Sequence, residues 1–256
     1  MPWDTVIRDG SAVTAMNSNA VGTMDDGFFS DLSFAFESLR ENHPGKPVVL
    51  SSAGKMFSPG LDLGNCVSLF KRGDKEEIDR WFEGFLKAAL TVFEHPAPVA
   101  AAIGGHAIAG GCILALCCDI RIAEKGKTLM GLNETSIGFP MPASLAALVE
   151  GVLGQEEGSE VIDGGKLHSV EQAFENGIVS RIAEPGGAVD EAVRECAKID
   201  LPDFIEVKKA RNSKIAEEVR DCFENEDRKT LAAKLSDSET VGKLDALLET
   251  LKKGRR

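Results

Sequence analysis

Two adjacent glycines and one carboxylate form the part of the sequence best suited to chemistry. Gly110-Gly111 precede an apolar stretch, Cys112–Cys117, which predicts a short buried helix. The first N–H groups of a helix have no partner inside it and attract negative charge, and glycine lets a ligand oxygen approach the backbone. Glu134 follows in an otherwise neutral run, Leu129–Ser144. An anion site with one nearby acid or base predicts chemistry through an enolate.

Strands and helices that alternate along the chain must position this segment. Asp9-Gly10 is a turn signal between two short β candidates, and Ser169 with Gln172 forms a capping box that opens a short helix ended by Gly177. The alternation predicts α/β layers with mainly parallel strands. The predicted strands are Thr5–Arg8, Ala12–Met16, Pro47–Ser51, Val99–Ile103 and Ile178–Ile182, and the longer helices are Asp25–Arg40, Lys75–Glu94 and Leu145–Leu153.

The last part of the chain contains no strand signal. From Pro202 onward only helical patterns remain, so we expect a core domain over residues 1–200 and a helical region over 201–256. The apolar stripes of these helices require a partner surface. The predicted helices are Ile205–Cys222, Asp227–Lys234 and Ser238–Lys252, and the last stripe consists of Val241, Leu244, Leu247 and Leu251.

Composition excludes several classes of function. The 256 residues carry 41 acidic and 29 basic side chains, a net charge of −12, which argues against partnership with nucleic acid or anionic membranes. No apolar run approaches the roughly 20 residues of a membrane span, and the first residues lack the pattern of a signal peptide, so we expect a cytoplasmic protein. The six cysteines lack metal-ligand spacing. We therefore predict reduced core thiols and no metal site.

Two separated blocks of sequence resemble a known family. Ser52–Leu63 contains FSPGLDL, and Gly104–Asp119 contains GHAIAGGCILALCCD. In this order and spacing they resemble the two signatures of the crotonase (enoyl-CoA hydratase/isomerase) superfamily. The resemblance covers about residues 5–200. It implies a spiral of ββα units and a C-terminal helical region used in assembly, so we expect a trimer or a dimer of trimers.

The resemblance also implies a substrate and an anion site. Members of the superfamily act on acyl-CoA thioesters, so coenzyme A enters with the substrate and no separate cofactor is expected. Two backbone N–H groups hold the thioester oxygen as it becomes an enolate, and these match Leu61 and Gly110 here. This agrees with the anion site expected at the start of the helix.

The identity of one residue favours one reaction of the superfamily. The first glutamate of the hydratases matches Ile113, which cannot exchange a proton, whereas the second matches Glu134. Moving a double bond requires only one carboxylate, which takes a proton from C2 and returns it at C4. The segments AGGCILAL, FSPGLDL and GLNETSIG resemble Δ3,Δ2-enoyl-CoA isomerases. We therefore predict an isomerase with Glu134 as the proton carrier, and Leu61 and Gly110 as the oxyanion donors.

Each of these residues also has a purely structural interpretation. Gly110-Gly111 could serve only close packing, and Glu134 could be a surface charge or a cap. The apolar flanks of Glu134 instead indicate a half-buried carboxyl with a raised pKa, so we favour catalysis. Asp62 could contact the substrate, but an acid before Leu63 more often caps a helix. For His106 we expect at most a minor positioning role.

The expected binding residues lie in both blocks and in the segment after the second strand. Many members of the superfamily carry an arginine just before this segment, whereas Ala15–Ser18 contains none here. Lys208, Lys209, Arg211 or the tail Lys252–Arg256 could meet the CoA phosphates, although a solvated helix face is the favoured interpretation of either. The complete predicted set is Asn19, Ala20, Ser58, Gly60, Leu61, Asp62, Leu63, His106, Gly110, Gly111 and Phe139.

Two other classes of function remain open. The same anion site could support hydration or thioester hydrolysis with Glu134 alone, which would place solvent oxygen in the product. A non-catalytic acyl-CoA binder is the second alternative, and a carboxylate in a neutral surrounding argues against it.

Overall fold

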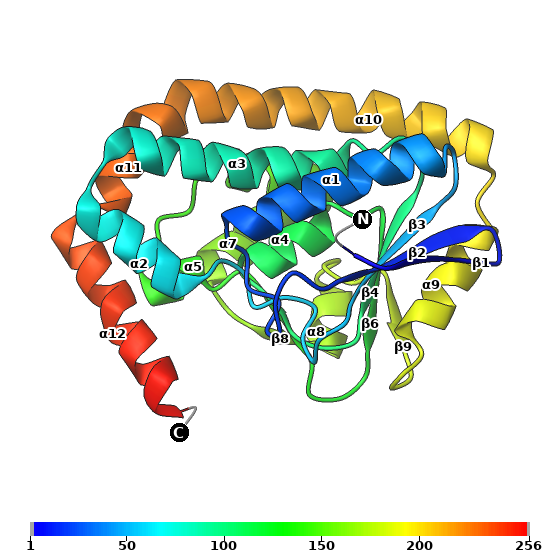
Figure 1. Ribbon diagram of the computed structural model, residues 1–256, viewed down its shortest axis with the longest axis horizontal. Helices are drawn as coiled ribbons and strands as arrows, with labels where there is room; N and C mark the ends of the chain where they lie inside the picture. Colours follow the sequence, from blue (N-terminus) through cyan, green and yellow to red (C-terminus); the bar gives the residue numbers. More distant parts are fainter. Residues whose placement is uncertain (1–2, 255–256) are drawn as a thin grey trace.

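A computed structural model describes residues 3–254 and contains two sheets (Figure 1). The larger sheet has the strand order β1-β2-β3-β4-β6-β9, and the smaller has the order β5-β7-β8. The larger consists of β1 (Thr5–Arg8), β2 (Ser11–Met16), β3 (Val48–Ser52), β4 (Val99–Ile103), β6 (Ile120–Glu124) and β9 (Arg181–Ala183). The smaller consists of β5 (Ala107–Ile108), β7 (Leu129–Gly131) and β8 (His168–Ser169).

Parallel pairing dominates the larger sheet, as the alternation of elements predicts. The expected hairpin is confirmed, because β1 and β2 pair antiparallel with Val6 opposite Val13. Every other pair in this sheet is parallel, and β4 has all five residues buried. A strand covered on both faces is uniformly apolar, which explains the run Val99–Ile103.

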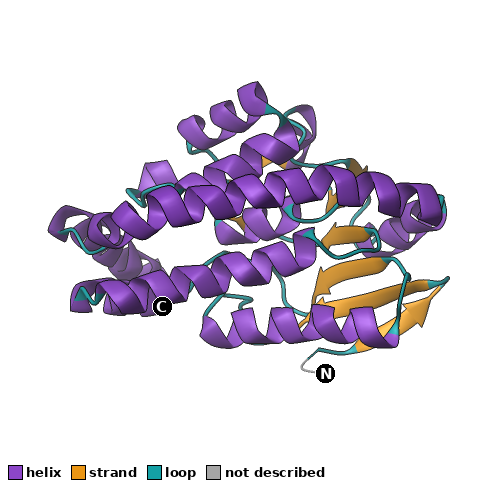
Figure 2. Cartoon of the chain, turned by 90° about the horizontal axis from the view of Figure 1, so that it is seen from above, coloured by secondary structure: helices purple, strands orange, loops and turns teal. Residues whose placement is uncertain are grey.

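Helices cover both faces of the larger sheet, and the strand period of two divides the core between them. Val49, Ala100 and Ile122 face α9 (Ala188–Ala197), whereas Leu50 and Ala101 face the larger core of the other helices. The strands lie on one side of the molecule, and long helices extend beyond them (Figure 2). On the larger face lie α1 (Asp26–Asn42), α3 (Lys75–Phe93) and α4 (Gly110–Leu116).

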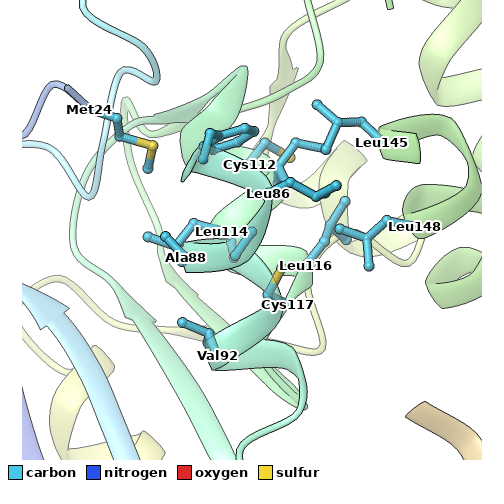
Figure 3. Close-up of a cluster of buried hydrophobic side chains, with 14 of the residues drawn as sticks. Met24, Leu86, Ala88, Val92, Cys112, Leu114, Leu116, Cys117, Leu145 and Leu148 are labelled. Atoms are coloured by element: carbon cyan, nitrogen blue, oxygen red, sulfur yellow. The ribbon is translucent and has the colours of Figure 1, made fainter. Parts of the chain in front are cut away.

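The short helix α4 lies at the centre of the larger core. All seven of its residues are buried. Figure 3 shows Leu114 and Leu116 packed among side chains of α3 and α6 (Ala143–Leu153), including Leu86 and Leu148. An apolar helix surrounded on every side cannot shift without opening the core, so its first residue is held in a fixed place.

Several elements differ from the sequence-based expectation. The predicted strand Ile178–Ile182 is shorter and begins at Arg181, and β6 was not predicted because Arg121 interrupts its apolar pattern. The capping box is confirmed, since Ser169 accepts from Gln172 N–H at the start of α8 (Val170–Glu175). The helices absent from the prediction are α5 (Glu134–Ile137), α7 (Gln155–Gly164) and α9, whereas α2 (Leu63–Arg72) is predicted only through its cap, Asp62.

The C-terminal region is helical, as predicted. Its helices are α10 (Leu201–Cys222), the π-helix η1 (Phe223–Asp227), α11 (Arg228–Leu235) and α12 (Ser238–Gly254). The apolar stripe of α12 is expected to need a partner subunit, but part of it is covered by the chain itself. Leu244 is buried within this chain, whereas Leu251 is 49% exposed. The stripe therefore does not by itself require a second subunit. The trimer and the division at residue 200 stay predictions.

Within residues 3–254, no helix combines the length and apolarity needed to cross a membrane.

A buried carboxylate joins the C-terminal region to the core. Asp227 lies in η1, and its two oxygens accept from the N–H groups of Ala143 and Ser144 at 2.8 and 3.0 Å. These two groups open α6 and have no partner inside that helix. A single side chain therefore fixes the start of α6 from a helix far away in the sequence.

Replacing Asp227 by alanine should destabilise the protein by about 1–3 kcal/mol, because two buried N–H groups lose their acceptor. Urea unfolding measures the difference. Asp221→Ala, which alters an exposed aspartate on α10, is the matched control and should stay within about 0.5 kcal/mol of wild type. Equal stability of the two variants would contradict the capping role.

Candidate functional site

A largely apolar cavity of about 430 Å³ contains both oxyanion candidates and Glu134. Its walls come from the loops after β2 and β3 and from α2, α3, α5 and α12. A larger hollow of about 490 Å³ lies between α1, α2 and α3, but neither Gly110 nor Glu134 lines it. The predicted chemistry therefore belongs to the 430 Å³ cavity, which we call the central cavity.

Close contact between two loops brings Leu61 and Gly110 together. Gly60 has φ +90°, and a Cβ there would lie 2.9 Å from both Gly110 N and Ile108 O, so only glycine fits. Ala109 also has a positive φ of 52°, unusual for a residue with a side chain. A Cβ on Gly110 would lie 3.6 Å from Leu61 N, so the two backbone nitrogens are neighbours.

Backbone hydrogen bonds fix these loops in place. Ser58 N donates to His106 O at 3.1 Å, and Ile108 N donates to Ser58 O at 3.0 Å. Met24 N donates to Gly60 O at 2.9 Å. Within residues 3–254, neither Leu61 N–H nor Gly110 N–H donates to a protein atom. The cavity therefore has two neighbouring donors available for one anionic oxygen.

The adjacent glycine has a packing role of its own. A Cβ on Gly111 would lie 2.2 Å from Ser58 O, which no side chain can tolerate. Gly110 would meet only ordinary contacts, the nearest being Met24 Sδ at 3.4 Å. Close packing therefore explains why residue 111 is a glycine. It does not require a glycine at position 110, where the N–H lies next to that of Leu61.

Glu134 is the first residue of α5 and lines the same cavity. Its side chain is almost fully buried, and burial raises its carboxyl pKa to about 7. Among the described residues, Oε2 has no hydrogen-bond partner. The surface-charge interpretation is wrong, because only 6% of Glu134 is exposed. A carboxyl with a pKa of about 7 can both take and give a proton near neutral pH.

Ile113 offers no second acid at this site. It is fully buried on α4 and is not among the residues that line the central cavity. Its surroundings are core side chains of the larger cluster. Among residues 3–254, Glu134 and Asp62 are the two carboxylates on the cavity wall.

Asp62 serves the start of α2, as its helix-capping interpretation predicts. Its Oδ1 accepts from Asn65 N at 2.9 Å, and the residue also lines the cavity. Leu61, Leu63 and Phe139 line it too. These positions agree with the predicted binding set, and their contacts with a substrate stay predictions.

Other predicted binding residues organise loops instead of lining the cavity. Asn19 Oδ1 accepts from the N–H groups of Gly22 and Thr23, at 2.7 and 3.1 Å, so its side chain shapes the loop after β2. Ala20 is exposed outside the cavity, and the next residue, Val21, lines it. Ser58 donates its hydroxyl to Gly22 O at 2.7 Å.

His106 also has a structural partner. Its Nδ1 accepts from Leu129 N at 2.9 Å, which ties the loop before Gly110 to β7, the strand that leads to Glu134. His106 does not line the central cavity. This geometry supports the minor positioning role expected from the sequence.

The basic residues of α10 lie away from the cavity. Lys208 is buried and pairs with Asp119 at 2.6 Å, and Arg211 approaches the other oxygen of Asp119 at 3.2 Å. Lys208 therefore neither contacts CoA at the cavity nor lies on a solvated helix face. Its pairing with Asp119 offsets the cost of removing its ammonium group from water. In the tail, Lys252 lines the cavity, and residues 255–256 lie outside the described part.

Sequence reasoning missed much of the apolar wall. Phe82 and Phe85 belong to a helical stripe that looks like ordinary core, and Leu247 and Leu248 come from the tail. Only the fold shows that these stripes face a cavity. Across residues 3–254, no group of three His, Cys, Asp or Glu side chains is arranged to hold a metal ion.

Comparisons with known proteins agree on one family. A family model described as "Enoyl-CoA hydratase/isomerase" matches residues 8–252. A putative enoyl-CoA hydratase of Thermus thermophilus is 33% identical over 158 residues, 62% of this chain and 61% of the relative. Mitochondrial enoyl-CoA delta isomerase 1 of Mus musculus is 27% identical over 175 residues, 68% of this chain and 59% of the relative. The chain thus spans less than two thirds of the length of each of these two relatives.

The fold also matches a solved structure over its whole length. The crystal structure of human mitochondrial delta3-delta2-enoyl-CoA isomerase superposes with a TM-score of 0.90 at 23% identity, covering 100% of both chains. At this identity the likeness concerns the fold, which is the one that the two sequence blocks imply.

The burial of Glu134 predicts a pH-dependent effect on stability. Its carboxyl pKa rises from 4.5 to about 7 on folding, so the native state binds the proton more tightly. Wild-type stability therefore loses on the order of 3 kcal/mol as pH rises through this window. Glu134→Gln removes the titration and should be more stable than wild type above about pH 8, with little difference near pH 4.

Urea unfolding over this pH range measures the effect. Glu41→Gln, an exposed carboxyl-to-amide change on α1, is the control and should follow wild type at every pH. A Glu134→Gln difference that does not vary with pH would contradict the raised pKa.

Proposed function

The chain belongs to the enoyl-CoA hydratase/isomerase family, and from this membership we propose that it shifts the double bond of a 3-enoyl-CoA to give trans-2-enoyl-CoA. The observation that carries the proposal is one buried carboxyl, Glu134, in the same cavity as two neighbouring backbone donors. The apolar Ile113 supports isomerisation over hydration, because it leaves the work of proton transfer to a single acid.

The proposed reaction uses the two backbone donors for charge and Glu134 for the proton. Glu134 takes a proton from C2, and the electrons of that C–H bond move into the thioester as a dienolate. The N–H groups of Leu61 and Gly110 stabilise the oxygen as it becomes negative. The electrons then return through the conjugated system to C4, which takes the proton from Glu134. No atom is gained or lost.

The pKa of Glu134 suits this double task. An ordinary glutamate would remain ionised at neutral pH and would return its proton poorly, whereas a pKa of about 7 balances the two steps. Burial in the cavity wall is the cause, and bound substrate would extend this shielding. Coenzyme A enters as part of the substrate in this proposal, and it would lie beside the exposed lining residues Val21, Leu251 and Lys252.

Hydration is the second candidate. The Thermus thermophilus relative is called a putative hydratase and is 33% identical, against 27% for the mouse isomerase. Glu134 would then activate a water that adds to C3 of a 2-enoyl-CoA. Incubation with each substrate in ¹⁸O-water distinguishes the reactions, because only hydration places the label in the product.

Glu134→Gln should reduce isomerisation by at least about 10²-fold while acyl-CoA binding is retained, because the amide keeps the shape but cannot accept the C2 proton. Conversion of 3-enoyl-CoA and calorimetric binding of a saturated acyl-CoA measure the two properties. For wild type, kcat/KM should fall as pH drops below about 7, where Glu134 becomes protonated. Wild-type turnover by the variant would overturn the mechanism.

Gly110→Pro removes one of the two donors. Isomerisation should fall by about 10²–10³-fold, as expected for the loss of one oxyanion contact. Proline is tolerated at the first position of a helix, so α4 should still form. Thermal unfolding checks that the fold survives, and a folded variant with unchanged turnover would exclude Gly110 N–H from the reaction.

A further inference from the structure

The central cavity has an open end and a closed end, which burial distinguishes. Val21 and Leu251 line it and are 36% and 49% exposed, so they mark the mouth. Cys66, Phe82 and Phe85 also line it and are nearly inaccessible, so they mark the inner end. A thioester held at Leu61 and Gly110 with CoA at the mouth therefore directs its acyl tail toward α2 and α3.

The inner end is rigid because further aromatic rings support it. Phe82 lies 6.1 Å from Phe85 and 6.0 Å from Phe223 of η1, measured between ring centroids. Phe85 is in turn 5.6 Å from Phe29 of α1. Rings packed on both sides cannot rotate away to admit a longer chain without opening the core.

The walls of this inner part suit an unsubstituted hydrocarbon. Leu145 of α6 also lines the cavity, and α12 adds Leu247 and Leu248 to its wall. Cys66 contributes a thiol whose pKa is raised by burial, so it is uncharged. Among the described lining residues the charged ones are Asp62, Glu134 and Lys252, and Lys252 is an exposed residue of α12 at the mouth. A carboxylate on the tail would therefore meet no cation at the inner end and would lose its hydration without compensation.

We propose that Phe82 and Phe85 set the longest acyl chain that the enzyme accepts, and that its substrates are unbranched, unsubstituted acyl-CoA esters of medium length. The inference rests on the proposed acyl-CoA function. A cavity of about 430 Å³ holds roughly fourteen groups the size of a water molecule. The thioester and the adjoining pantetheine atoms occupy part of this space, so the acyl tail that fits is shorter than about fourteen carbons.

The test compares chain-length profiles of wild type, Phe82→Leu and Phe85→Leu. The control is Phe93→Leu, which removes a buried ring from the same helix outside the cavity. Binding of saturated acyl-CoAs from hexanoyl to hexadecanoyl is measured by calorimetry, and turnover of the matching 3-enoyl-CoAs is measured in parallel. Each added CH₂ should strengthen binding by about fourfold until the tail reaches the phenylalanines, and not beyond.

Leucine at either position should move this limit to longer chains by about two carbons or more, while the control keeps the wild-type limit. An unchanged limit in both folded variants, or an identical shift in Phe93→Leu, would overturn the inference. The binding series separates the two proposals, because a limit that moves in binding without any turnover supports the chain-length role and contradicts the isomerase. Failure to bind any acyl-CoA would overturn both.

Discussion

The approach of two backbone segments, without side chains between them, is the constraint on which the site depends. Gly60 lies against Ile108 and Gly110, and Gly111 lies against Ser58 O. A single Cβ at Gly60 or Gly111 would force these loops apart and separate the two donors. The positive φ of Ala109 adds strain of about 1–3 kcal/mol, which the surrounding packed core offsets.

Burial gives Glu134 the raised pKa on which its proposed role depends, and it also destabilises the fold at neutral pH. The same desolvation that raises the carboxyl pKa to about 7 makes the ionised form costly in the native state. The short helix α5 holds this residue in the cavity wall, and Gly138 at its end packs against the stem of Lys243 on α12. The proposed role of Glu134 and the stability of the fold are therefore opposed at one residue, and the rest of the core compensates for the cost of its burial.

The C-terminal helices complete the cavity in addition to extending the molecule. Leu247 and Leu248 of α12 form part of its wall, and Asp227 in η1 fixes the start of α6, which carries Leu145. The helical region predicted for residues 201–256 thus contributes to the wall of the central cavity. This explains why the apolar stripe of α12 is partly covered within one subunit.

The sequence by itself determined the parts of the protein that depend on local patterns. Alternation and turn residues predicted the hairpin and the parallel strands, and the glycines and the neutral surroundings of Glu134 predicted the anion site and the acid, because these signals lie within a few neighbouring residues. The tertiary structure alone decided which apolar stripes face a cavity. Phe82 and Phe93 are buried residues of the same type on the same helix, but only Phe82 lines the cavity. This difference depends on how distant segments pack around each ring, which the local pattern does not contain.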